Sequence, residues 1–180
     1  DILNIWQSKK VSWEDNNILT GHAGSLLSLG DLYVSCAEWE PPYVFIEHCM
    51  ESLCSAVEHI KESPRRFYLG LSHGLAGILA ALEVGSYHFQ LNRPKALIDW
   101  CFEQLVKESI VINNMAVWPT LSSDRKAQMH TWCHGSPGIA LALIGAYRSS
   151  SLQRYLDLFQ LASLATETFV PVRLNSLCCG

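Results

Sequence analysis

Three cysteines and two histidines lie in short motifs that each end in a glycine; these motifs are called glycine phrases below. Cys133 and His134 form one such pair, Cys178 and Cys179 form another, and His73 stands in a third phrase. Thiolates and imidazoles are the usual protein ligands of zinc, and three ligands with an open fourth position are typical of a catalytic site. The pattern indicates a metal centre of thiolates. Since the sequence has no CxxC pair, burial of these cysteines as small hydrophobic side chains is the alternative.

The same phrase recurs along the chain. Aligned on its glycines, position 73 matches positions 134 and 179, with position 20 as a weaker match, at intervals of 53, 61 and 45 residues. Repeats of this length are typical of arrays of helical pairs, in which each pair packs only on its neighbours. The four copies cover residues 20–33, 72–84, 132–147 and 176–180.

The two histidines are candidates for acid and base chemistry. His73 and His134 occupy one repeat position, and imidazole exchanges protons near neutral pH. A structural histidine that only forms hydrogen bonds is the alternative for each. The adjacent Cys178 and Cys179 would not share a helix face, so both reach one metal only from a loop or the first turn of a helix. A helix N-terminus would also favour their thiolate forms.

The spacing of apolar residues predicts helices almost throughout. Each glycine phrase precedes a small, apolar helix, and a longer amphipathic helix follows it, which favours an all-α array of inner and outer helices. The run 110–112 fits either a strand or the end of a helix. The remaining cysteines fall on apolar helix faces and are predicted to pack in the core: Cys36, Cys49, Cys54 and Cys101.

The composition excludes several classes of protein. The 180 residues carry a formal net charge of −4, and basic residues do not cluster beyond Arg65 and Arg66, which argues against nucleic acid as a partner. We expect no membrane span, because no apolar stretch approaches 18 residues. Seven cysteines without a secretory signal favour reduced thiols and a cytoplasmic location. The last phrase stops at Gly180, so we expect an incomplete domain over residues 1–180.

The phrases together resemble the motifs of a known family. Residues 132–139, WCHGSPGI, resemble the WCHGxPGI motif of lanthionine synthetase C-like proteins, and residues 72–78, SHGLAGI, resemble their SHGxAGI motif. Residues 176–180, SLCCG, resemble SLCHG with cysteine in place of histidine. The residues of these motifs are most similar to those in the cyclase domain of class II lanthipeptide synthetases, in which a dehydratase domain lies upstream.

The resemblance implies a fold and a reaction. The family fold is an α/α toroid of seven helical pairs, of which this chain would supply three to four. A zinc ion activates a peptide cysteine thiol, which adds to dehydroalanine or dehydrobutyrine in a dehydrated precursor peptide and closes a lanthionine thioether ring. The resemblance thus predicts a zinc-dependent lanthionine synthetase of lanthipeptide biosynthesis, although this fragment by itself is expected to be inactive if the ring of repeats is open.

The resemblance also assigns roles residue by residue. Cys133 matches the first zinc ligand, Cys178 the second, and Cys179 the third, where the family usually has histidine. His73 matches the proposed acid/base histidine, and His134 matches an aromatic or histidine position beside the metal. One departure is Asn17, which stands where the family usually has an aspartate that orients an imidazole.

Two other functions stay open at this point. A non-catalytic helical scaffold with a structural zinc would need a fourth protein ligand that closes the site. A glutathione-handling protein, like the eukaryotic members of the family, is the other alternative, and the class II phrasing argues mildly against it.

Overall fold

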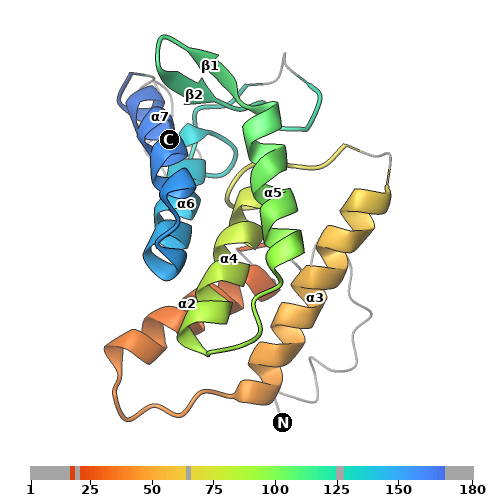
Figure 1. Cartoon of the computed structure of the whole chain (residues 1–180), viewed down its shortest axis with the longest axis vertical. Coiled ribbons are helices and arrows are strands. Elements are labelled where there is room, and N and C mark those ends of the chain that lie inside the picture. The colour runs from red at the N-terminus through yellow and green to blue at the C-terminus, as the bar shows by residue number, and fades with distance from the viewer. Residues whose placement is uncertain (1–16, 19–20, 64–65, 125–127, 169–180) are drawn as a thin grey trace.

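The computed structural model describes residues 17–18, 21–63, 66–124 and 128–168. Within these ranges the chain forms helices and one short hairpin (Figure 1). Their order is α2 (His22–Ser35), α3 (Tyr43–Glu62), α4 (Leu75–His88), α5 (Lys95–Glu108), β1 (Ile110–Ile112), β2 (Met115–Val117), α6 (Ser136–Ser150) and α7 (Gln153–Thr168).

The helices divide into an inner and an outer set. The inner helix α4 packs between α2 and α6, while α3, α5 and α7 each pack on the inner helix that precedes them (Figure 1). Eleven of the fourteen residues of α4 are buried, but only five of the fourteen of α5. A helix that is apolar on every side must be enclosed, whereas a helix with one apolar face lies at the surface. The prediction of an all-α protein with the helical-pair arrangement of an α/α toroid is therefore confirmed.

Every described inner helix begins with the same backbone turn. The N-cap residues are Gly21, Gly74 and Gly135, with φ of −126°, −137° and −120° and ψ of −168°, −169° and −171°. These are extended conformations that any residue can adopt. The reason for glycine at Gly74 and Gly135 is steric, because a Cβ atom there would lie 2.6 Å from the Tyr68 carbonyl and 2.2 Å from the Met129 carbonyl oxygen.

The second glycine of each phrase lets the preceding loop fold back over the first helical turn. A Cβ atom at this glycine would meet the carbonyl oxygen six residues earlier at 1.7 to 2.1 Å. The pairs are Gly24 with Ile18, Gly77 with Leu71, and Gly138 with Trp132. No side chain fits at such a distance, so the repeated glycines hold each loop tightly against its own helix.

The hairpin resolves the open alternative for residues 110–112, which form a strand. β1 pairs with β2 in antiparallel register, with Ile110 opposite Val117. The two residues between the strands, Asn113 and Asn114, have φ of 50° and 63°. Asparagine tolerates this left-handed conformation better than most residues, and two-residue hairpin turns require it.

The four core cysteines behave differently. Cys49 and Cys101 are buried, as predicted, and Cys54 is half-buried against the core. The prediction for Cys36 is wrong, because α2 ends at Ser35 and Cys36 is an exposed C-cap residue. Apolar spacing continues past the end of the helix, so periodicity alone does not show where burial stops.

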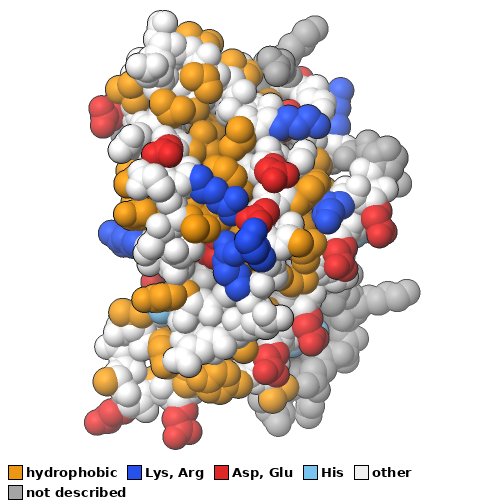
Figure 2. All heavy atoms as spheres, in the orientation of Figure 1, with side chains coloured by type: hydrophobic (Ala, Val, Ile, Leu, Met, Phe, Trp, Pro, Cys, Tyr) orange, Lys and Arg blue, Asp and Glu red, His pale blue; other side chains and the backbone are white. Residues whose placement is uncertain are grey.

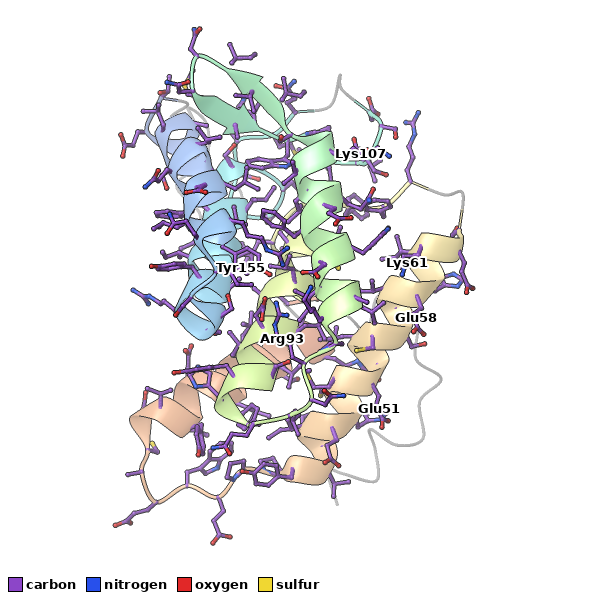
Figure 3. All side chains as sticks on the ribbon, viewed as in Figure 1. Glu51, Glu58, Lys61, Arg93, Lys107 and Tyr155 are labelled. Carbon is purple, nitrogen blue, oxygen red and sulfur yellow. The ribbon has the colours of Figure 1, made fainter. Side chains whose placement is uncertain are left out.

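A buried carboxylate joins three elements of the fold. Glu83 on α4 has an exposed fraction of only 1%. It accepts two hydrogen bonds from the Arg93 guanidinium, at 2.8 and 2.5 Å, and one from the Tyr155 hydroxyl at 2.6 Å. Arg93 lies just before α5 and Tyr155 lies on α7, and both are labelled in the middle of Figure 3.

The surface carries both signs of charge. Figure 2 shows Lys and Arg side chains next to Asp and Glu side chains on the face that it displays. Among the helices that the structure describes, none is both long enough and apolar enough to cross a membrane.

Candidate functional site

Backbone hydrogen bonds join the glycine phrases of successive repeats. The amide of Ile18 donates to the carbonyl of Ser72 at 2.9 Å, and the amide of Ser72 donates to the carbonyl of Cys133 at 3.2 Å. Three loops that are separated by more than fifty residues along the chain therefore lie side by side at the start of the inner helices. This end of the helical array is where the predicted site residues of the described region gather.

Gly70 allows the second and third loops to touch. A Cβ atom at Gly70 would lie 2.2 Å from the carbonyl oxygen of Cys133 and 2.6 Å from the Cα atom of His134. Both neighbours are backbone atoms, which cannot rotate away from a clash. Any larger residue at this position would push the loop of Cys133 and His134 away from the loop of His73.

Cys133 lies on the turn before α6 and is 2% exposed. The start of α6 is held from the other side by the hydroxyl of Ser136, which donates to the carbonyl oxygen of Ala116 in β2 at 2.9 Å. The hairpin therefore supports the turn from which the Cys133 side chain arises. Cys133 is disulfide-bonded in the structure. Its sulfur becomes a metal ligand on this supported turn only once it is reduced to the thiolate.

The two predicted acid/base histidines stack on each other. The rings of His73 and His134 have centroids 5.6 Å apart and planes 29° apart, and both residues are half-buried. The structure therefore brings the loop of His73 against the loop of Cys133 and His134, which lies about sixty residues further along the chain. Burial and the neighbouring His73 both lower the pKa of His134, so its ring is favoured in the neutral form.

Several polar atoms of these loops are buried without a hydrogen-bond partner. Within the described part of the chain they include Ser72 Oγ, Thr131 Oγ1 and His134 Nδ1. Buried polar atoms are nearly always paired in native proteins, and an exception points to a water, ion or ligand. Because these atoms lie in two adjacent loops, they indicate that the loops bind a polar group between them.

Two of the three predicted zinc ligands, Cys178 and Cys179, lie outside the described residues. Among residues that the structure does describe, no group of three or more His, Cys, Asp or Glu side chains is arranged to hold a metal ion. Cys133 is thus the one predicted ligand whose surroundings are described. Asn17, at the usual aspartate position, accepts hydrogen bonds at its backbone carbonyl from the amides of Gly21 and Gly24, at 3.1 and 3.5 Å.

The sequence did not indicate Tyr68 as a site residue. Its ring lies against the ring of His134, with centroids 5.6 Å apart and planes 39° apart. Tyr68 precedes the second phrase by a few residues, outside the motif itself. Its position six residues before Gly74, where the chain folds back over the helix start, was the available signal, because a Cβ atom at Gly74 would lie 2.6 Å from the Tyr68 carbonyl.

Pairs of inner and outer helices, whose glycine loops are joined by hydrogen bonds at the starts of the inner helices, define the class, an α/α toroid protein. The family model of the lanthionine synthetase C-like proteins matches residues 2–180, and the chain belongs to that family.

A curated relative is the glutathione S-transferase LANCL1 of Danio rerio, which is 24% identical over 155 residues. The match covers 79% of this chain and 38% of the relative. The chain therefore spans well under half of the length of that curated protein.

Proposed function

We propose that the protein is a zinc-dependent cyclase that adds peptide cysteine thiols to dehydroalanine or dehydrobutyrine and so forms lanthionine rings. The observation that carries the proposal is the meeting of Cys133, His134 and His73 in two adjacent phrase loops. Family membership supports the same reaction class. The substrate would be a dehydrated precursor peptide, and the dehydration would be the work of a separate catalytic unit.

Zinc would be held by Cys133, Cys178 and Cys179. When bound, it would lower the pKa of the substrate thiol so that the thiolate is present near neutral pH. The orphaned polar atoms in the loops of Ser72 and His134 are in keeping with a polar occupant of this region. The buried position of Cys133 would keep water away from the ligand sulfur.

The imidazoles would transfer a proton during the addition. In the addition, the substrate sulfur forms a bond to the β-carbon of the dehydro residue while the carbon–carbon double bond opens. The electron pair moves to the α-carbon as an enolate, which must then take up a proton. A protonated ring nitrogen of His73 would supply that proton, and the thiol proton lost at the start would restore it. His134, stacked against His73, would hold the ring of His73 in place.

The test is a ring-closure assay with the full-length zinc-loaded protein and a peptide that contains one cysteine and one dehydroalanine. Ring closure leaves the peptide mass unchanged but removes the free thiol, so maleimide labelling followed by mass spectrometry reports it. We expect labelling to be lost with the parent protein and retained with Cys133→Ala and with His73→Asn. The exposed Cys36 provides the matched control, and Cys36→Ala should cyclise as the parent does.

A second candidate function is the addition of glutathione to a dehydro residue in a peptide. The favouring observation is the name of the relative from Danio rerio, a glutathione S-transferase. The same site chemistry would serve, with the thiol arriving from glutathione rather than from the peptide. Incubation of a cysteine-free dehydroalanine peptide with glutathione separates the two functions, because only this reaction adds the mass of glutathione to the peptide.

The outcomes distinguish the alternatives. Loss of the peptide thiol without glutathione supports the cyclase, and a glutathione adduct supports the transferase. Tight zinc binding with neither reaction would instead favour a helical scaffold with a structural metal, and chelation should then unfold the protein.

A further inference from the structure

We infer that Tyr68 is a positioning residue, which holds the His134 ring in its place against His73 by ring packing. The inference rests on the proposed function, because it concerns the imidazoles of that site.

Two rings pack on the His134 ring. The centroid of Tyr68 lies 5.6 Å from that of His134, with planes 39° apart, and the centroid of His73 also lies 5.6 Å away, with planes 29° apart. Aromatic rings prefer such tilted and offset packing to a face-to-face sandwich. Removing Tyr68 would take away one of the two ring contacts of His134.

Hydrogen bonds do not hold the His134 ring at its Nδ1 atom. This nitrogen is buried and has no hydrogen-bond partner among the described residues. A histidine that works in a site normally owes its orientation to a hydrogen bond at one ring nitrogen. In its absence, ring packing against Tyr68 and His73 sets the orientation of His134.

Tyr68 is itself well anchored. Its carbonyl accepts a hydrogen bond from the amide of Leu75, the first residue of α4, at 3.0 Å. Tyr68 also forms an isolated antiparallel bridge with Leu121. The next amide, that of Leu69, donates to the carbonyl of Thr120 at 3.2 Å. A residue tied to a helix start and to a second loop provides a fixed surface for its neighbour.

The role belongs to the ring and not to the hydroxyl. The Tyr68 side chain packs through its ring on His134, and the residue is 38% exposed. Phenylalanine would retain the stacking surface, whereas leucine would remove it with little change in volume. This difference makes the inference testable with two substitutions at one position.

The first experiment is NMR on the protein without added metal, so it does not depend on activity. We expect a nuclear Overhauser effect between ring protons of Tyr68 and His134 in the parent. Tyr68→Leu should shift the His134 ring resonances, because the ring current of tyrosine is lost, and Tyr68→Phe should leave them close to the parent positions. Tyr87→Leu is the matched control, since Tyr87 packs edge-on against His88 with centroids 5.0 Å apart on α4.

The second experiment measures ring closure by the full-length zinc-loaded variants. An aromatic pair contributes about 0.5–1.5 kcal/mol beyond its buried area, so Tyr68→Leu should lower kcat by about twofold to tenfold with KM nearly unchanged. Tyr68→Phe should restore the parent kcat, and Tyr87→Leu should have no effect.

Each result bears on the inference separately from the proposed function. A missing Tyr68–His134 effect in the parent spectrum, or a Tyr68→Phe variant as slow as Tyr68→Leu, would overturn it. An unchanged kcat in Tyr68→Leu, with the Tyr68–His134 effect present in the parent, would also overturn it. A parent protein that closes no rings would refute the cyclase proposal, and the spectra would still decide whether Tyr68 orders His134. If Tyr68→Leu does not fold, the parent spectrum and Tyr68→Phe still give the decision.

Discussion

At the scale of single residues, the same side chain serves different purposes in different surroundings. Cys133 is buried on a supported turn, Cys49 and Cys101 are packed in the core, and Cys36 caps a helix at the surface. Burial without a positive neighbour disfavours the thiolate, because the charge would lose its hydration. Chemistry at a cysteine therefore depends on whether something nearby compensates the thiolate charge.

Replacement of Cys133 should remove zinc from the protein. We expect Cys133→Ala to lose most of the bound metal, because a catalytic zinc site has only three protein ligands and removing one lowers the affinity for the ion. Metal content per protein chain after dialysis is the measurement. Cys36→Ala should keep the parent stoichiometry, and an unchanged zinc content in Cys133→Ala would exclude Cys133 as a ligand.

The thiols should differ in their reactivity toward iodoacetamide. Burial raises the pKa of Cys49 to about 12, and burial together with Glu58 and Glu51 raises the pKa of Cys54 to about 11. At pH 8.5 the native protein should therefore be modified at the exposed Cys36 first, while Cys49 and Cys101 react only after unfolding. Peptide mass spectrometry over time measures the order. Labelling of Cys49 as fast as Cys36 in folded protein would contradict the described burial.

At the scale of elements, each glycine phrase starts an inner helix while the preceding loop packs tightly over its first turn. Its N-cap glycines share one backbone conformation in all three described copies. Its second glycines leave room for a carbonyl oxygen within 2.1 Å of where a Cβ atom would stand. The loop that results presents the residues just before the first glycine, which are the candidate ligands and histidines.

Two glycines of α6 should respond in opposite ways to alanine. A Cβ atom at Gly138 would lie 1.9 Å from the carbonyl oxygen of Trp132, so the loop of Cys133 must move. We expect Gly138→Ala to lower the free energy of unfolding by about 2–4 kcal/mol and to reduce zinc content. At Gly145 a Cβ atom meets nothing within 4 Å, so Gly145→Ala should raise stability by up to about 1 kcal/mol. Urea unfolding of both variants is the measurement, and equal effects would refute the close approach.

At the scale of the whole molecule, polar side chains hold neighbouring helical pairs together. Glu83 on α4 bonds to Arg93 before α5 and to Tyr155 on α7. Arg154 on α7 bonds to Asp99 on α5 and lies over the ring of Phe102, with its guanidinium carbon 4.7 Å from the ring centroid. Burial and the bond to Glu83 raise the pKa of Tyr155, which keeps its hydroxyl as a donor.

Removal of the Tyr155 hydroxyl should loosen this junction. Tyr155→Phe leaves the buried carboxylate of Glu83 short of one donor, and hydrogen bonds to charged groups contribute about 1.5–3 kcal/mol. We expect a loss of stability in that range. Tyr147→Phe is the matched control, because Tyr147 is half-buried on α6 and no hydrogen bond of its hydroxyl is seen among the described residues. Equal stability of Tyr155→Phe and the parent in urea would contradict a role for this bond.

Much of the fold follows from local sequence patterns. Apolar spacing predicted the helices, and the small residues after each glycine predicted the enclosed inner set, because α4 has few polar side chains to place in water. Local patterns did not fix where every element ends. Apolar spacing placed Cys36 in the core, although it lies beyond the end of α2. The spacing also left residues 110–112 open between a strand and a helix end, and the turn at Asn113 and Asn114 makes them a strand.

The residues at the start of each inner helix follow from the sequence, because the glycine phrase repeats and places His73 and His134 at one repeat position, with Cys133 just before the second. Which of these loops touch follows from the packing of the helices. The contact of Gly70 with the loop of Cys133, and of Tyr68 with His134, joins residues about sixty positions apart. Such contacts depend on how α4 packs on α6, which no local pattern encodes.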